Sequence, residues 1–299
     1  MKGPYFIGIG SHKGGTTWLA KNFREHPNIW IPPVKELDYF YRLQYGPRDN
    51  LSVLMNGGSF IGREWRKHVV NLLGRRYRKH PYPEALEWGL KYIFGHLGDE
   101  WYCSLFDPAR GRICGEISTS YALVNEDVVA HAYRMLPDTK IIYLLRNPIR
   151  RAYSQIVMDF CHFQKRKLED IKDDEIFDRL NLDDHIIRHC FYHANLNRWA
   201  KSFGREKIFI GFFEDIATRP VELLYELFEF VGAYTPSNYT PPFAHNRYNV
   251  SVVKKPNSKT PRRFATPIAK LIINDMELLA KEVGGPSASW LEEAMQYLD

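Results

Sequence analysis

Residues 5–19 read YFIGIGSHKGGTTWL, and this stretch decides the expected fold. An apolar, strand-like run breaks into a glycine-rich turn, which carries one lysine and two threonines and then opens a helix. Backbone N–H groups of such a turn, together with the N-terminus of the helix after it, converge on an anion. In loops that bind nucleoside triphosphates the lysine follows the last glycine, whereas Lys13 here precedes the Gly14–Gly15 pair. We therefore expect an anion site of a different kind.

The composition fits a folded protein that binds an anion. The chain has 299 residues and a mass of 35.1 kDa, and 44% of its residues are hydrophobic, which suffices for a buried core. Its formal net charge of +6 favours an anionic ligand but is modest for a dedicated nucleic-acid-binding protein. We therefore expect no nucleic-acid partner.

The compartment is predicted from features that the sequence lacks. The first residues, MKGPY, have no apolar signal-peptide core, and no apolar run approaches the roughly 18 residues that cross a bilayer. The four cysteines are scattered and form no C-x-x-C pair, which favours reduced thiols. We expect a cytoplasmic protein without a membrane span. The sequence does not indicate an oligomeric state.

The order of predicted elements is that of an α/β protein. Short runs rich in Ile, Val, Phe or Tyr predict buried strands over 5–10, 112–117, 140–145 and 207–213. Helical patterns lie at 16–26, 125–135, 149–163, 182–203, 220–231 and 267–283, and a short terminal helix follows. This alternation predicts a three-layer fold in which a central parallel sheet is flanked by helices. We expect one domain over 1–299, with a basic and aromatic insertion at about 41–98 and a basic loop, free of acidic residues, at about 234–263.

A second motif, RNPIRRAYS over 146–154, follows the third predicted strand. Arg146 would lie at the carboxyl edge of the sheet, where open α/β sheets bind their ligands. Ser154 would lie two turns into the next helix. A guanidinium fork and a hydroxyl together suit a single phosphate group. We interpret Arg151, on the same helix, as a solvated charge.

Together the two motifs resemble those of the sulfotransferase family, whose members use 3′-phosphoadenosine 5′-phosphosulfate (PAPS). The sequence KGGTT over 13–17, followed by LRNPxxRAYS over 145–154, is most similar to the heparan-sulfate-type and bacterial branch. The match covers roughly 4–39 and 111–159. The resemblance implies PAPS as co-substrate and a P-loop-like fold. It assigns the 5′-phosphosulfate to Lys13, Gly14, Gly15, Thr16 and Thr17, and the 3′-phosphate to Arg146 and Ser154.

This resemblance implies transfer of a sulfuryl group to a hydroxyl or amine without a metal. A lysine ammonium aimed at the bridging oxygen stabilises the charge that develops as the S–O bond breaks. The strand before Arg146 ends without an aspartate for Mg²⁺, unlike the kinases and GTPases. The resemblance maps a proton-accepting glutamate onto Glu36, which could instead be a solvated carboxylate or a partner of Lys35. Asp38 and His12 are alternative bases, and His12 could also donate to the sulfuryl oxygens.

The acceptor side is less defined. The segment GEISTSY over 115–121 resembles the family's second acceptor segment, although Ile117 stands where the heparan-type pattern has lysine. Glu116 is expected to be either an active-site carboxylate or the buried partner of a basic residue. The acceptor would be a carbohydrate or a small natural product. The residues expected to contact it are Glu116, Asp38, Tyr39 and Tyr121.

Three further residues and two other functions stay open at this point. Trp18 would lie near the adenine or in the core, and Lys254 and Lys255 would reach the 3′-phosphate or be solvated. One alternative function is a non-catalytic module that binds adenosine nucleotides or polyanions. The other is a P-loop phosphotransferase, which the position of Lys13 disfavours.

Overall fold

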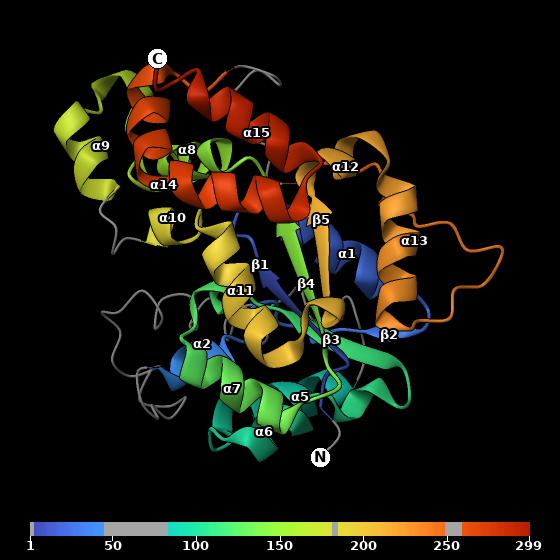
Figure 1. Cartoon of the computed structure of the whole chain (residues 1–299). Helices are drawn as coiled ribbons and strands as arrows, with labels where there is room; N and C mark the ends of the chain where they lie inside the picture. Colours follow the sequence, from blue (N-terminus) through green and yellow to red (C-terminus); the bar gives the residue numbers. More distant parts are fainter. Residues whose placement is uncertain (1–2, 45–82, 181–184, 249–258) are drawn as a thin grey trace.

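The computed structural model describes residues 3–44, 83–180, 185–248 and 259–299 (Figure 1). Its centre is a five-stranded sheet in the order β2-β3-β1-β4-β5, in which each neighbouring pair is parallel. The strands are β1 (Phe6–Gly10), β2 (Ile29–Trp30), β3 (Ile113–Ile117), β4 (Lys140–Leu145) and β5 (Ile208–Phe212). Because all strands run the same way, their carboxyl ends share one edge, and β1 lies in the middle of the sheet.

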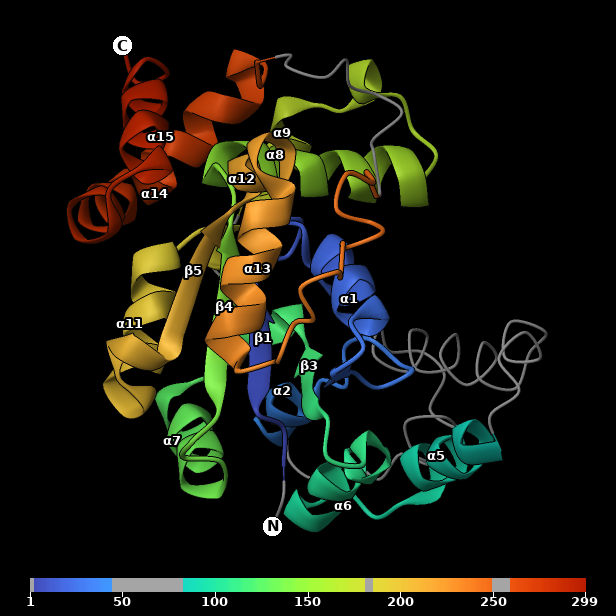
Figure 2. The same ribbon diagram turned by 90° about the vertical axis from the view of Figure 1, so that its right-hand side faces the viewer.

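Side chains of β4 alternate between two hydrophobic cores, as the two-residue period of a strand requires. Ile141, Tyr143 and Leu145 belong to the larger core, while Ile142 and Leu144 belong to the smaller one. Helices α7 (Glu126–Met135) and α11 (Tyr192–Phe203) contribute to the larger core, and α1 (Thr16–Glu25) and α13 (Pro220–Val231) to the smaller one. Figure 2 shows α7 and α11 on one side of the sheet and α1 on the other. The predicted α/β fold with a helix-covered parallel sheet is confirmed.

The remaining α-helices and one π-helix pack around the sheet and against one another. They are α2 (Tyr39–Leu43), α5 (Pro83–Phe94), α6 (Asp99–Ser104), α8 (Pro148–Val157), a π-helix (Met158–Phe163), α9 (Asp173–Arg179), α10 (His185–Arg188), α12 (Phe213–Thr218), α14 (Arg262–Val283) and α15 (Pro286–Met295). In the described part of the chain no helix combines the length and apolarity that a membrane crossing needs.

Three predicted helices differ from the observed ones. The helix predicted over 149–163 changes from α-helix to π-helix at Met158. The closing helix begins at Arg262 rather than at 267, with Pro267 inside it. In place of one helix over 182–203, the described residues form α10 and α11. Most of the predicted insertion lies outside the described residues, and the rest of it contains α5.

Candidate functional site

The loop between β1 and α1 is fixed to the end of β4. The backbone N–H of Ser11 donates to Leu144 O at 2.7 Å, and that of Gly14 donates to Ser11 O at 2.9 Å. A Cβ at Gly14 would lie 2.3 Å from Ser11 Oγ and 2.7 Å from Leu144 O, so only glycine fits. Gly15 is left-handed, with φ of 99°, and lacks a side chain to cap the N–H groups of α1. The N-terminus of α1 therefore has no side-chain cap from Gly15, an arrangement that suits the binding of an anion.

Lys13 occupies a left-handed position in this loop, with φ of 67°. Its Nζ lies 3.5 Å from Sδ of Met158, the first residue of the π-helix. Burial lowers the pKa of Lys13, and the guanidinium groups of Arg146 and Arg151 lower it further. The lysine is thus held among other cations by a weak, neutral acceptor, and a π-helix at this position is a frequent feature of functional sites.

Arg146 reaches the loop from the junction of β4 and α8. Asn147 caps α8 by accepting two backbone N–H bonds, both at 3.1 Å. The preceding Arg146 donates from Nη1 to Lys13 O at 3.1 Å, and its guanidinium carbon lies 4.6 Å from the ring centroid of Phe213. Ser154 is half-buried on the same helix. The predicted approach of the second motif to the first is therefore present in the structure, while a phosphate shared by Arg146 and Ser154 stays a prediction.

Arg151 is fully buried, so its interpretation as a solvated charge is wrong. Its guanidinium donates to Gln155 Oε1 at 2.8 Å, to Cys190 Sγ at 3.3 Å and to Ile186 O. The last bond satisfies a carbonyl at the end of α10, which is a physical reason for the break in the helix predicted over 182–203. Among the described residues, neither Arg151 nor its neighbours Lys13 and Arg146 form an ion pair with a carboxylate. Three buried or half-buried cations therefore converge on the loop.

His12 lies between these cations and the carboxylates of the site. Its ring centroid is 5.9 Å from that of His189. Burial lowers the pKa of His12 to about 4, and the Arg151 guanidinium acts in the same direction, whereas Glu36 and a hydrogen bond with Gln155 raise it. His12 is therefore neutral near pH 7.

Glu36 and Asp38 form a pair of carboxylates on left-handed backbone, with φ of 67° and 55°. Glu36 accepts hydrogen bonds from the Lys35 ammonium and, at 3.1 Å, from Thr119 Oγ1. Burial by itself would raise the pKa of Glu36, but Lys35 lowers it overall. Asp38 accepts from Ser120 Oγ at 2.5 Å, and burial together with the charge of Glu36 raises its pKa to about 7. The two carboxylates therefore differ in proton affinity, as an acid–base site requires.

Glu116 is buried and fully engaged by hydroxyl groups. Tyr102 and Tyr121 donate to Oε1 at 2.6 and 2.8 Å, and Ser118 donates to Oε2 at 2.7 Å. Burial raises the pKa of Glu116. The expectation that Glu116 could partner a basic residue is therefore wrong, because its partners are hydroxyls. Its contact with an acceptor, like that of Tyr121, stays a prediction.

The structure gives two other predicted site residues a place in the core. Trp18 is 2% exposed and donates from Nε1 to a backbone carbonyl at 2.7 Å, which supports the core alternative. Tyr39 is 1% exposed and donates to Asp99 Oδ1 at 2.5 Å. Lys254 and Lys255 lie outside the described residues.

Sequence reasoning missed three residues that surround the loop. They are Arg151, His189 and Met158. Arg151 and Met158 lie on helices and His189 directly follows α10, and the packing of α10 and α14 beside α8 brings these segments together. The spacing of Arg151 and Gln155, at i and i+4 on one helix, is a signal that could have indicated their contact.

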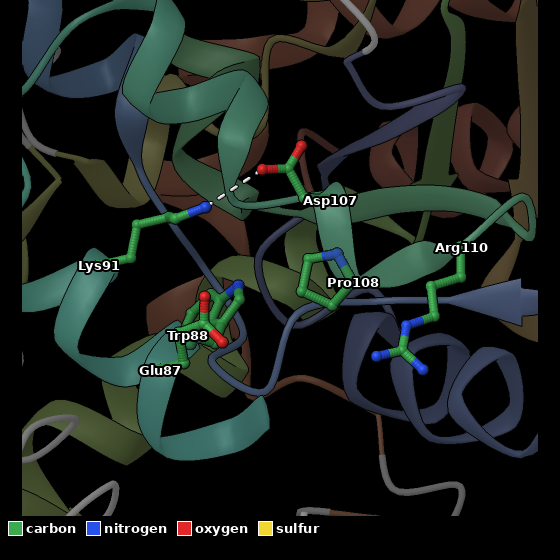
Figure 3. A pocket seen from close by; sticks show the side chains of 6 residues that line it. All are labelled: Glu87, Trp88, Lys91, Asp107, Pro108 and Arg110. Carbon is green, nitrogen blue, oxygen red and sulfur yellow. Dashed lines mark hydrogen bonds and ion pairs between the residues drawn. The ribbon is translucent and has the colours of Figure 1, made fainter. Parts of the chain in front are cut away.

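A separate shallow pocket lies away from the loop (Figure 3). Its lining residues are Glu87, Trp88, Lys91, Asp107, Pro108 and Arg110. Figures 1 and 2 show α5 at the end of the molecule where the N-terminus and the amino ends of the strands lie. Lys91 Nζ donates to Asp107 Oδ2 at 3.1 Å across this pocket, and Trp88 is 2% exposed. One cation of this pocket is therefore paired with a carboxylate, unlike Lys13 and Arg146 at the loop.

Residues 118–262 match the family model described as a sulfotransferase domain. Carbohydrate sulfotransferase 15 of Mus musculus is 23% identical to the chain over 257 residues, which cover 77% of this chain and 44% of the relative. The Homo sapiens protein of the same name is 22% identical over the same length. The chain thus spans less than half the length of these relatives.

Solved structures share the fold over nearly the whole chain. A sulfotransferase from Alicyclobacillus acidocaldarius aligns with a TM-score of 0.65 and 21% identity, over 97% of this chain and 99% of that chain. The sulfotransferase domain from the Synechococcus PCC 7002 olefin synthase aligns with a TM-score of 0.55 and 17% identity, over 99% of this chain and 96% of that chain. At these identities the likeness establishes the fold.

Proposed function

The chain belongs to the sulfotransferase family, and on that premise we propose that it transfers a sulfuryl group from PAPS to an acceptor hydroxyl or amine. The observation that carries this proposal is the pairing of a glycine loop with cations that lack a carboxylate partner in the described part of the chain. Gly14 leaves room where a Cβ would clash, and Lys13 and Arg146 meet at the loop. These residues fit a ligand with several negative charges.

Each residue of the loop has a defined task in the proposed transfer. Lys13 would donate to the bridging oxygen as the S–O bond breaks, so that the electron pair stays with the departing phosphate. Arg146 and Ser154 would hold the 3′-phosphate and fix the donor in line with the acceptor. A carboxylate of the Glu36–Asp38 pair would take the acceptor's proton as the new O–S bond forms.

The acceptor proposed here is a sugar hydroxyl. Its support is the printed name of the relatives, which are carbohydrate sulfotransferases. The structure supplies a carboxylate pair, one ammonium and several hydroxyls next to the loop, from Lys35, Thr119 and Ser120. Such groups can hydrogen-bond the hydroxyls of a sugar ring.

The donor is tested by ligand-induced stabilisation. A nucleotide that binds only the native state raises the melting temperature, so we expect a larger shift with 3′-phosphoadenosine 5′-phosphate (PAP) than with ATP–Mg²⁺. The Arg146→Ala variant should lose the shift. An equal shift with ATP–Mg²⁺, or none with PAP, would refute the donor assignment.

The acceptor is tested by transfer of label from ³⁵S-PAPS to a panel of sugars, phenols, lipids and polyketide alcohols. We expect label on a sugar and none with the Lys13→Ala variant. Transfer to another class alone would keep the enzyme but replace its acceptor.

A further inference from the structure

His12 occupies the loop position directly before Lys13, and groups from three other segments face it. Arg151 and Gln155 come from α8, and His189 follows α10. Glu36, after β2, is the negative group that faces His12. The imidazole is therefore a proton-binding group placed inside the expected anion site.

The positive charge around His12 lacks direct neutralisation. Arg151 donates hydrogen bonds to three neutral acceptors, which are Gln155 Oε1, Ile186 O and Cys190 Sγ. Glu36, the negative group, is itself bonded to the Lys35 ammonium. Asp159, the carboxylate that acts on Lys13, pairs with Arg179, so that among the described residues no carboxylate pairs directly with Lys13 or Arg151.

His189, beside His12, is also surrounded by groups that disfavour a positive charge on its ring. It is 5% exposed, and its Nδ1 has no hydrogen-bond partner among the described residues. Burial, Arg151 and His12 all lower its pKa well below the ordinary value. Two adjacent imidazoles are thus kept neutral beside a buried guanidinium, first because burial disfavours their charged forms and second because another cation there would be repelled.

We propose that His12 takes up a proton from solvent when the anionic donor binds the loop, which adds a second cation beside Lys13 only in the loaded site. This inference rests on the proposed donor. A bound anion cancels the repulsion from Arg151 and Lys13 and favours the charged imidazole. By linkage, protonation of His12 must strengthen donor binding by the same factor. The imidazolium would then donate to the phosphosulfate oxygens.

The coupling is measured by isothermal titration calorimetry with PAP as the probe. At pH 6, titrations in buffers of different ionisation enthalpy give the number of protons taken up on binding. Because the phosphates of PAP titrate near pH 6 themselves, the informative quantity is the difference between the wild-type protein and His12→Gln. We expect a difference between about half a proton and one proton.

The affinity for PAP gives a second readout of the same coupling. Between pH 6 and 7 it should fall more steeply in the wild-type protein than in His12→Gln, by up to about tenfold per pH unit. The matched control is His96→Gln, because His96 is exposed beyond α5, away from the loop. That variant should behave as the wild-type protein does.

Ring ¹⁵N chemical shifts of the wild-type protein test the inference without a variant. At pH 6 they should show a neutral His12 in the free protein and a protonated one in the PAP complex. Equal proton uptake in the wild-type protein and His12→Gln, or a neutral ring in the complex, would overturn the inference while leaving the donor intact. Failure of PAP to bind the wild-type protein would overturn the proposed donor and this inference with it.

Discussion

Replacing Asp38 with asparagine should stabilise the protein at alkaline pH. Burial and the charge of Glu36 raise the pKa of the Asp38 carboxyl to about 7 in the folded protein. In the unfolded chain the carboxyl returns to an ordinary pKa near 4. The folded state therefore binds the proton more tightly, and this group's contribution to stability is lost as the pH rises from about 4 to about 7.

The magnitude follows from the pKa. A rise from 3.8 to about 7 corresponds to at most about 4 kcal/mol. Asp38 is only half-buried, so solvent screening reduces the expected effect to about 2 kcal/mol. An asparagine side chain keeps an oxygen that can accept the Ser120 hydrogen bond and carries no charge to desolvate.

The assay is urea denaturation of the wild-type protein and Asp38→Asn at pH 5 and pH 8.5. The free energy of unfolding should favour the variant by about 1 kcal/mol more at pH 8.5 than at pH 5, because part of the total loss has already occurred between pH 4 and pH 5. Neutralising the exposed Glu229 by Glu229→Gln serves as the control and should give no such difference. A variant whose advantage does not grow with pH would show that the charge of Asp38 is well solvated or compensated.

Further predictions concern the loop and the two buried networks. Lys13→Ala should abolish sulfuryl transfer from ³⁵S-PAPS, and Arg146→Ala should abolish the thermal shift with PAP, because each removes a cation from the anion site. Glu36→Gln should keep the PAP affinity while the transfer rate falls at least about 100-fold. Near-normal turnover would mean that the base is Asp38, His12 or Glu116. Tyr102→Phe leaves Glu116 with one donor fewer and should lower the free energy of unfolding by about 1–3 kcal/mol in chemical denaturation; unchanged stability would indicate that water replaces the hydroxyl.

The strands and the first motif could be predicted because their signals are local. The observed β1, β3, β4 and β5 lie within one residue of the predicted bounds at either end. β2, by contrast, has two residues, Ile29–Trp30, and is held by its register with β3, which is too short a run for a hydrophobic pattern. A strand of this length can be assigned only when the strand that it pairs with is known.

The environment of the site could not be predicted, because it depends on contacts between distant segments. Arg151 looks like a surface charge in the sequence, yet it is buried and donates to Ile186 O in α10 and to Cys190 Sγ just after it. The two carboxyls differ in pKa because Lys35 lowers the pKa of Glu36, whereas burial and then the charge of Glu36 raise the pKa of Asp38. Sequence spacing brings such groups to the same region, but it does not determine which of them is paired.

The central place of β1 divides the site between the two strands beside it. On the β4 flank, Arg146 and the loop meet the expected donor, whereas on the β3 flank Thr119 and Ser120 meet Glu36 and Asp38. The two flanks can therefore diversify separately during evolution. Changes after β3 would retarget the enzyme to a new acceptor and leave the proposed donor site after β4 intact. Grafted acceptor segments would offer the same route to an engineer.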